Sequence, residues 1–193
     1  MATAARAPYH GIVLAGGASR RMGQDKAFLE VDGVPLIQRA LDALAGATHR
    51  TVIGGDAHRI SSLGVDHLPD ATPGAGPVPA IATALDASVA PLTVILPCDL
   101  PFITSDAIER LCSVLGDGDV AVPLVAGRVA WLPSVWNASL APQVATMHER
   151  GIRSVRRIAA ELSVVHFVDF RPSAWADADR PADLPLGVVT ELR

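Results

Sequence analysis

The sequence is poor in aromatic residues, in cysteine and in long apolar runs. Aromatic residues make up only 4% of the 193 positions, so the core is expected to combine Val- and Leu-rich strands with Ala-rich helices. The two cysteines, Cys98 and Cys112, are too few for a disulfide framework and indicate thiols in a reducing compartment. Residues 1–8 lack the apolar run of a signal peptide, and no run of about 18 uncharged apolar residues predicts a membrane span. We therefore expect a cytoplasmic protein without a membrane partner.

The sequence also lacks an excess of positive charge. Its formal net charge of −4 argues against nucleic acid or an anionic membrane as a partner, because both need a basic surface. A phosphate ligand is not excluded, since one local basic cluster is enough to bind it. Half of the residues are apolar and 19% are charged, which is typical of a globular protein, and 193 residues suffice for one α/β domain.

Short apolar segments alternate with helical patterns along the chain. Strand patterns cover 11–15, 51–53, 65–68, 92–96, 120–125, 129–136 and 164–168, and a further short extended segment covers 27–31. Helical patterns cover 35–45, 79–89, 105–115 and, as one or two helices, 140–162. This alternation predicts an α/β fold: a single-domain, three-layer α/β/α sandwich with a mostly parallel, Rossmann-like sheet. We expect residues 1–9 to form a flexible N-terminus and residues 10–193 to form the domain.

A glycine-rich, basic loop follows the first strand, at the edge of the sheet where parallel α/β proteins bind ligands. Gly16 and Gly17 allow the backbone to approach a ligand closely and expose N–H groups to an anion. Arg20 and Arg21 offer planar forks to phosphate oxygens, and Lys26 adds a point charge. The loop therefore predicts a site for a nucleoside triphosphate; the alternative is a surface turn with incidental charges. Two commoner phosphate loops are excluded by spacing, because the sequence matches neither G-x-x-x-x-G-K-[ST] nor G-x-G-x-x-G.

A second candidate element is the carboxylate that follows the apolar strand at 92–96. Asp99 precedes Pro101, and its side chain is expected to point into the crevice at the strand ends. Magnesium prefers few protein ligands together with phosphate oxygens and water, so one carboxylate suffices to hold it. The alternative is an Asp that caps a helix or a turn. The neighbouring Cys98 is expected to be a small buried packing residue.

A third element is Asp70 with the glycine-containing loop at 74–81. Guanine presents two donors, N1–H and N2–H, to one carboxylate, so Asp70 could select guanine among the bases. The alternative is a capping Asp in a turn before a helix, and the sequence leaves both interpretations open.

The run LAGGASRRMGQDKA at 14–27 resembles the signature of the molybdenum cofactor guanylyltransferases (MobA), within the Rossmann-like nucleotidyltransferases. The pattern L-A-G-G-x-S-x-R-M-G-x-D-K is matched at every defined position. The resemblance covers nearly the whole chain and is looser in its C-terminal third. It implies that the nucleotide is bound by Leu14, Ala15, Gly16, Gly17, Lys26, Asp70 and Asp99.

The resemblance also implies the reaction. GTP would bind across the first loop, with Lys26, Arg21 and Asp99 as the catalytic residues and Asp99 as the ligand of Mg²⁺. The phosphate of molybdopterin, already carrying molybdenum, would attack the α-phosphorus and expel pyrophosphate, giving a molybdopterin guanine dinucleotide cofactor. Positioning and charge neutralisation suffice for such a transfer, so no side-chain nucleophile is required. Proteins that deliver or receive the cofactor are expected as transient partners.

Residues 177–184 resemble the family segment N-x-N-T-P-E-[DE]-L, with Asp177 and Asp179 in place of the asparagines. Two carboxylates two residues apart point the same way from an extended chain, so both can face a metal. Asp179 is therefore the second predicted metal contact. The alternative is a solvated acidic loop.

Other positions depart from the family pattern or leave two interpretations open. Gly54 stands where the family often has Asn, and residues 78–80 (Val-Pro-Ala) depart from the end of G-P-L-A-G. Trp131 and Trp136 either pack on a pterin or fill the core. The arginines of the segment 151–157 either grip the acceptor phosphate or form a solvated basic face: Arg153, Arg156 and Arg157.

Three alternative functions follow from the same residues. A relative that uses CTP on the same acceptor usually carries Leu-Ala-Ala-Gly, which the Gly16-Gly17 pair disfavours. A second alternative transfers a nucleotide to a sugar phosphate or to phospholactate. The third is a non-catalytic nucleotide-binding protein. The presence of both Asp99 and Lys26 argues against it, while Gly54 and the altered region around Trp131 leave it open.

Overall fold

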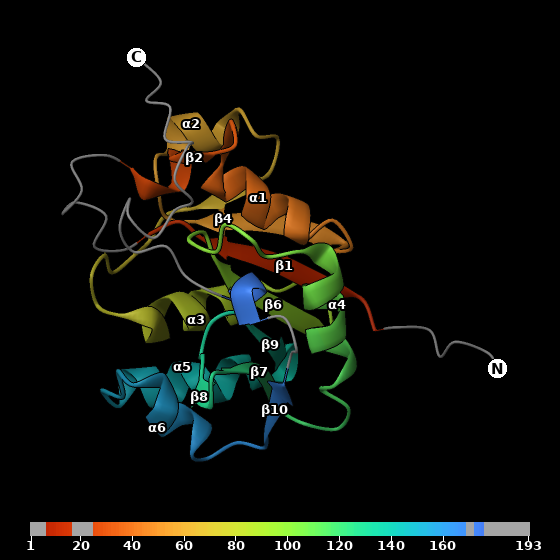
Figure 1. The fold of residues 1–193 in the computed structure, drawn as a ribbon. Coiled ribbons are helices and arrows are strands. Elements are labelled where there is room, and N and C mark those ends of the chain that lie inside the picture. The colour runs from red at the N-terminus through yellow and green to blue at the C-terminus, as the bar shows by residue number, and fades with distance from the viewer. Residues whose placement is uncertain (1–6, 17–24, 169–171, 176–193) are drawn as a thin grey trace.

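The computed structural model describes residues 7–16, 25–168 and 172–175. Its centre is an eight-stranded sheet with the order β10-β7-β9-β6-β1-β4-β5, and β8 pairs with β7 (Figure 1). The strands of this sheet are β1 (Tyr9–Leu14), β4 (His49–Ile53), β5 (Asp66–Leu68), β6 (Leu92–Pro97), β7 (Val120–Val125), β8 (Arg128–Val129), β9 (Ser134–Asn137) and β10 (Val164–Val168). A separate antiparallel pair joins β2 (Glu30–Val31) to β3 (Val34–Pro35).

The helices are α1 (Leu36–Ala43), α2 (Ala57–Ser61), α3 (Pro77–Asp86), α4 (Ser105–Ser113), α5 (Ala141–Glu149) and α6 (Val155–Ala159). Short 3-10 helices are η2 (Lys26–Phe28), η3 (Ala138–Leu140) and η4 (Pro172–Trp175).

The central sheet is mostly parallel. β1 runs parallel to both β4 and β6, β4 to β5, and β7 to β10, while β9 lies antiparallel between β6 and β7. The chain therefore passes from β1 to one side of the sheet, through β4 and β5, and then returns to the other side of β1 as β6. Open α/β sheets bind ligands at such a change of direction, outside the carboxyl ends of the strands.

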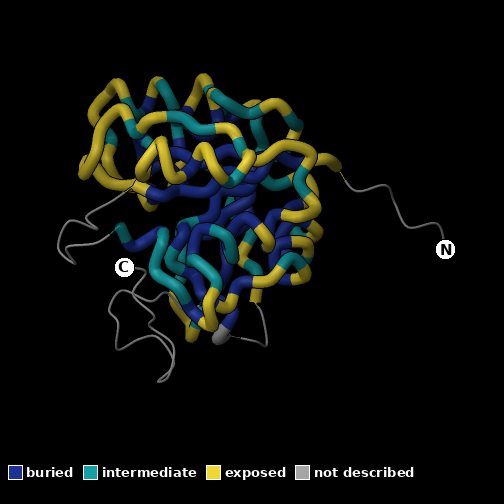
Figure 2. The backbone as a smooth tube through the Cα atoms, turned by 90° about the horizontal axis from the view of Figure 1, so that it is seen from above, coloured by how far each residue is buried: buried dark blue, intermediate teal, exposed yellow. Residues whose placement is uncertain are grey.

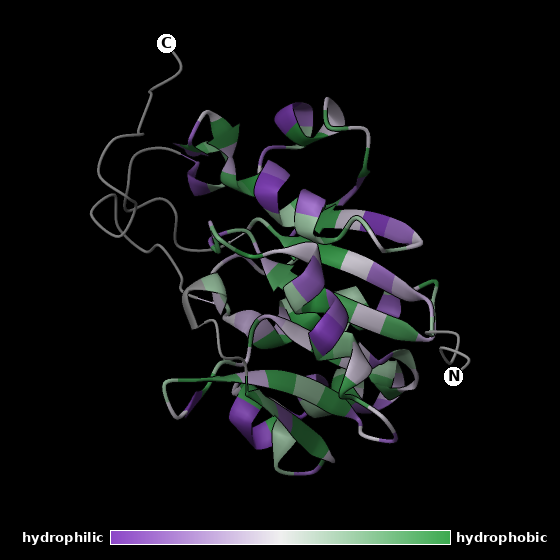
Figure 3. Cartoon of the chain, turned by 45° about the vertical axis from the view of Figure 1, so that its right-hand side comes forward, coloured by the Kyte–Doolittle hydropathy of each residue, from purple (hydrophilic) through white to green (hydrophobic). Residues whose placement is uncertain are grey.

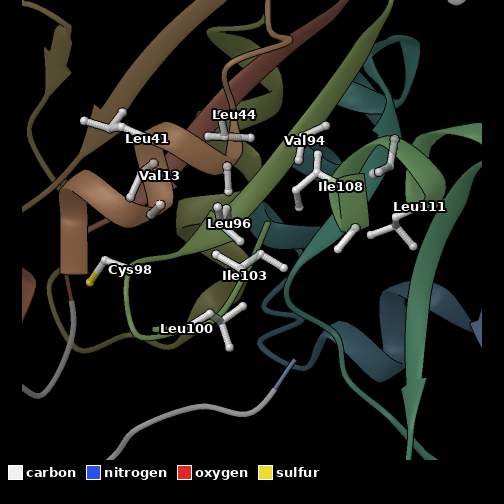
Figure 4. Packing of buried hydrophobic residues seen from close by; sticks show 14 of the residues in the cluster. Val13, Leu41, Leu44, Val94, Leu96, Cys98, Leu100, Ile103, Ile108 and Leu111 are labelled. Carbon is white, nitrogen blue, oxygen red and sulfur yellow. The ribbon is translucent and has the colours of Figure 1, made fainter. Parts of the chain in front are cut away.

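Apolar residues pack on both faces of the sheet. Val13 and Leu96 belong to a core that α1, α2 and α4 cover, and Figure 4 shows the side chains of that core between the helices and the central strands. Ile12 and Ile95 alternate with them and belong to a second core under α3, α5 and α6. The central strands are accordingly buried in Figure 2 and hydrophobic in Figure 3, with polar residues on the outer helices. The predicted three-layer α/β/α sandwich with a mostly parallel sheet is confirmed.

Trp136, on β9, is a core residue. Its side chain is fully buried, and its Nε1 donates to Oγ of Ser134 at 2.7 Å. The indole N–H therefore has its partner inside the protein, as a buried tryptophan requires. Core filling is the correct interpretation of Trp136, and the half-buried Trp131 packs against the same core.

Two predicted strands are wrong in detail. The segment 27–31 was expected to be extended throughout, but it begins inside η2. The carboxylate of Asp25 accepts the N–H of Ala27 at 3.2 Å and the Asp25 carbonyl accepts the N–H of Phe28 at 3.0 Å, which closes the helical turn. The single strand predicted over 129–136 is divided into β8 and β9 by residues 130–133, where the Leu132-Pro133 peptide is cis.

The helix α2 is an addition to the predicted elements, because five residues are too few to show a helical period. It begins at an Asp56 cap, whose Oδ1 accepts the N–H groups of His58 at 2.9 Å and Arg59 at 3.1 Å. The hydrogen bond from Arg59, followed by that from His58, lowers the pKa of Asp56.

At the start of the domain, β1 begins at Tyr9, which is buried.

Candidate active site

The candidate site lies at the carboxyl ends of β1 and β6. Leu14, the last residue of β1, pairs with Pro97, the last residue of β6. The N–H of Cys98 continues this pairing by donating to the Leu14 carbonyl at 3.2 Å. The segments that follow the two strands therefore leave the sheet side by side, at its change of direction.

Lys26 and Asp99 meet at this point, although they are far apart in the sequence. Nζ of Lys26 donates to Oδ2 of Asp99 at 3.2 Å, and the side chains of the pair are 11% and 27% exposed. Solvent and its ions screen the two charges less at these partly buried positions than they would at fully exposed ones. Asp99 lies in the turn after β6, which agrees with the turn part of the predicted alternative. It does not cap the next helix, because Thr104 caps α4 by accepting the N–H of Ala107 at 3.2 Å. A cation and a carboxylate that solvent still reaches suit phosphate oxygens and a divalent ion, respectively.

Cys98 lies beneath this ion pair. Burial raises the pKa of its thiol to about 12; the negative charges of Asp99 and Asp25 act in the same direction, and Lys26 opposes them. A thiol with such a pKa is protonated at neutral pH and is no nucleophile. Cys98 is therefore the buried packing residue that was predicted.

Asp25 is a site residue that the sequence argument did not single out. Its carboxylate caps η2, the short helix on which Lys26 is the first residue. It fixes the backbone from which the Lys26 side chain extends. The available signal was its position immediately before Lys26 in a loop without other acidic residues.

Gly16 and Gly54 lie in contact where the loops after β1 and β4 meet. Gly54 has a φ of +78°, and a Cβ on it would come within 2.9 Å of both Cα and N of Gly16. A Cβ on Gly16 would in turn lie 2.8 Å from Oδ2 of Asp70. Gly54 has no room for a side chain, whereas a side chain at Gly16 would require the Asp70 carboxylate to move. The two glycines therefore allow the three segments to come close together. The Gly54 departure from the family pattern thus has a structural role that the sequence argument missed.

Asp70 stabilises its own turn. Its Oδ1 accepts the N–H of Thr72 at 3.0 Å, as in an Asx turn. The turn interpretation is therefore correct for this oxygen. The other oxygen, Oδ2, faces Gly16, and contact between Asp70 and a guanine base stays a prediction.

The helix α3 begins with two prolines. Pro77 and Pro79 occupy its first and third positions, after Gly76 with a φ of +88°. Proline is accepted in the first helical turn because the amides there have no acceptor within the helix. Among the first three positions only Val78 has an N–H group, so this N-terminus offers fewer donors to an anion than an ordinary one.

The arginines at 153–157 lie beyond α5, on the side of α3. Nη1 of Arg153 donates to the carbonyl of His148 at 2.6 Å, while Arg156 and Arg157 are exposed on α6. The Arg153 carbonyl is 4.0 Å from the position of a Cβ on Gly76, so this segment borders the loop before α3. Binding of an acceptor phosphate by these arginines stays a prediction.

Some predicted site residues lie outside the described residues: Gly17, Arg20, Arg21, Asp177 and Asp179. Within 7–16, 25–168 and 172–175, no three or more His, Cys, Asp or Glu side chains gather as a metal site. In the same ranges, no helix has the length and apolar character needed to cross a membrane. Binding of a metal ion by Asp99 stays a prediction.

Known proteins resemble this chain over most of its length. Residues 11–165 match the MobA-like NTP transferase domain. A molybdenum cofactor guanylyltransferase of Rhodobacter capsulatus is 34% identical over 184 residues, covering 90% of this chain and 92% of that protein. The chain belongs to the MobA-like NTP transferase family. The prediction of this family is confirmed, and in this MobA-like transferase the fold brings Lys26 and Asp99, both predicted to be catalytic, into direct contact.

Two further relatives extend the comparison of the MobA-like domain. A protein of Mycobacterium tuberculosis (strain H37Rv), named probable molybdenum cofactor guanylyltransferase, is 33% identical over 175 residues, covering 86% of this chain and 87% of that protein. The crystal structure of molybdopterin-guanine dinucleotide biosynthesis protein A from Archaeoglobus fulgidus has the same fold, with a TM-score of 0.73. It is 21% identical and covers 90% of this chain and 94% of that chain.

Proposed function

We propose that this protein transfers GMP from GTP to the phosphate of molybdopterin, releasing pyrophosphate and forming a molybdopterin guanine dinucleotide cofactor. The observation that carries the proposal is the Lys26–Asp99 pair, 3.2 Å apart beyond the adjacent ends of β1 and β6. The names of the relatives from Rhodobacter capsulatus and Mycobacterium tuberculosis support GTP as the donor and a molybdenum cofactor precursor as the acceptor.

In this reaction, Lys26 neutralises charge on the triphosphate. Its side chain is nearly buried and its ammonium is already held at the site by Asp99, so little conformational entropy is lost when a phosphate oxygen binds. An oxygen of the acceptor phosphate bonds to the α-phosphorus, while the bond from that phosphorus to the bridging oxygen breaks and pyrophosphate leaves. No proton transfer is needed, so no general base is required of the chain. Arg21 would add a second cation from the loop after β1.

Asp99 is the residue that would hold Mg²⁺. Its carboxylate is 27% exposed and caps no helix, and Lys26 is the one ion-pair partner that we identify for it among the described residues. A single carboxylate matches the preference of this ion for few protein ligands and for phosphate and water oxygens. When bound, the ion supplies charge neutralisation on the triphosphate. Asp179 is the second proposed contact.

The test is pyrophosphate release by the purified protein with molybdopterin as the acceptor. GTP with Mg²⁺ is expected to give turnover, whereas CTP, ATP and UTP are expected to give at most a few per cent of that rate. Removal of divalent ions with a chelator is expected to abolish turnover, and added Mg²⁺ to restore it.

The alternative functions give different results in the same assay. Faster turnover with CTP would indicate a cytidylyltransferase. Pyrophosphate release that requires a sugar phosphate or phospholactate would identify another acceptor. Calorimetric binding of GTP without any pyrophosphate release would indicate a non-catalytic protein. Contact with proteins that deliver or receive the cofactor remains a separate proposal.

A further inference from the structure

Arg39, on α1, joins two segments that are distant in the sequence. Its Nη2 donates to the carbonyl of Val31 and lies 3.5 Å from Oδ2 of Asp32, at the turn between β2 and β3. Its Nη1 donates to the carbonyl of Pro101 at 3.3 Å, in the loop between β6 and α4. One planar guanidinium therefore ties the β2–β3 hairpin and the loop after β6 to the same helix.

Both segments lead directly to the site. The hairpin follows η2, and its connection to Lys26 is kept short by hydrogen bonds from the N–H of Leu29 to the Lys26 carbonyl at 3.1 Å and from the N–H of Leu36 to the Leu29 carbonyl at 2.9 Å. On the other side, Pro101 lies two positions after Asp99. The guanidinium therefore links the segment that carries Lys26 to the segment that carries Asp99.

We propose that Arg39 is a positioning residue that sets the separation of Lys26 and Asp99. The inference rests on the proposed function and adds a residue that itself lies outside the ion pair. Only a planar fork reaches acceptors on both segments at once, and a lysine ammonium at the same place would reach one of them.

The burial of Arg39 supports this role. Its side chain is 22% exposed, and its buried Nε finds no hydrogen-bond partner among the described residues. A buried donor without a partner is destabilising, whereas both terminal nitrogens of Arg39 have carbonyl acceptors. The two terminal nitrogens, Nη1 and Nη2, are the atoms of Arg39 that contact the two segments.

The first experiment compares Arg39→Gln with Arg50→Gln. Arg50 is a matched control, because its Nη1 also donates to a backbone carbonyl, that of Leu41 on α1 at 3.4 Å, but from β4 and away from the site. We expect Arg39→Gln to lower kcat/KM for pyrophosphate release from GTP on the order of 100-fold, the size of effect that a small misplacement produces. Arg50→Gln is expected to stay within about twofold of the wild type, and Arg39→Lys to recover part of the loss.

A double-mutant cycle separates positioning from a general structural effect. GTP affinity is measured by calorimetry with Mg²⁺ for the wild type, Arg39→Gln, Lys26→Met and the double variant. If Arg39 acts through Lys26, its substitution weakens GTP binding about tenfold in the wild type and less than about twofold in the Lys26→Met background. A merely structural role would weaken binding equally in both backgrounds, and that result would overturn the inference. If Arg39→Gln does not fold, Arg39→Lys takes its place in the cycle.

Failure of the inference and failure of the proposed function are distinguishable. If the wild type and Arg50→Gln release pyrophosphate from GTP and Arg39→Gln does so equally well, the inference is wrong while the function stands. If none of them releases pyrophosphate from GTP, the proposed function is wrong, and with it the role given to Arg39.

Discussion

Buried polar side chains lie near both ends of β1, and the two groups differ in kind. At the amino end, His10 is 3% exposed, its Nε2 is 2.9 Å from Oγ1 of Thr51, and its Nδ1 accepts the N–H of Val89 at 3.4 Å. Beyond the carboxyl end, Lys26 and Asp99 form an ion pair at 3.2 Å, and the Asp99 side chain is 27% exposed. The polar atoms of the first group are hydrogen-bonded inside the fold, whereas the second group is still accessible to solvent.

The difference separates stability from function. Burial lowers the pKa of His10, with the charge of His49 acting in the same direction, which favours the neutral imidazole. The hydrogen bonds of the ring are made within the fold. Both ring nitrogens of His10 already have partners in the protein, so neither is available to hydrogen-bond a ligand. A partly exposed ion pair contributes little to stability, but it keeps two charges that a ligand can use. We therefore expect substitutions at the carboxyl end to affect turnover, and those at the amino end to affect unfolding.

The largest effect is expected for Asp99→Ala. Loss of the carboxylate should reduce pyrophosphate release by about 10³-fold or more. The proposed Mg²⁺ would lose its protein ligand, and the negative charge of the reacting phosphates would no longer be neutralised. The melting temperature should change little, since the side chain is partly exposed. Asp106→Ala is the control: Asp106 pairs with Arg110 at 3.3 Å on α4, and its loss should leave turnover unchanged. Near-normal turnover of Asp99→Ala would contradict its role.

Lys26→Ala is expected to have the next largest effect. Turnover should fall by about 10²–10³-fold, the usual loss when one preorganised electrostatic group is removed. GTP should also bind more weakly in a calorimetric titration. A variant that turned over normally but melted many degrees lower would show that the ion pair is structural, and the contrast between the two ends of β1 would be lost.

Gly54→Ala should have a moderate effect on both properties. An added Cβ would be 2.9 Å from the backbone of Gly16, and the φ of +78° is unfavourable for alanine. We expect a loss of about 1–3 kcal/mol in the free energy of unfolding, together with weaker GTP binding. Gly64→Ala is the matched control, because its φ is +66° and no atom lies within 4 Å of the added Cβ. If both variants bind GTP equally, the contact with Gly16 has no part in the site.

The smallest effect is expected for His10→Gln, as a change in the pH dependence of stability. The folded-state pKa of His10 lies below the ordinary value of 6.5, so the unfolded chain takes up this proton at a higher pH. Its contribution to stability is present above pH 6.5 and is lost as the pH falls from there through the lower, folded-state pKa. His10→Gln should flatten this acid limb in chemical unfolding at several pH values and leave turnover unchanged. Loss of turnover would place function at the amino end as well.

The sequence allowed much of the site to be predicted, because its main parts are local. The loop after β1 is a continuous motif, and Asp99 follows a strand whose apolar character is plain. Their meeting followed from the expectation that parallel strands end at a common edge. The contact of Gly16 with Gly54 and the links made by Arg39 could not be derived in this way, since they depend on which loops become neighbours in the folded sheet.

The fold could be predicted for similar reasons. The prediction was wrong where the local sequence pattern is weak. Segments with a clear period, such as β7 and β10, agree with the predicted boundaries. The 3-10 turn at Lys26 depends on hydrogen bonds to the carboxylate and the carbonyl of Asp25, and α2 is too short to show a helical period. The division between β8 and β9 depends on pairing with different neighbours: β8 pairs with β7 alone, whereas β9 lies between β6 and β7. The pattern of apolar residues along the chain does not show any of these features, so it could not predict them.

The two prolines at the start of α3 reduce the number of backbone donors at that helix N-terminus, since only Val78 among its first three residues has an N–H group. An anionic group is therefore attracted less strongly by this N-terminus than by an ordinary one, while Lys26 supplies a positive charge beyond β1. Replacing Pro77 or Pro79 with alanine would restore one amide at the start of the helix.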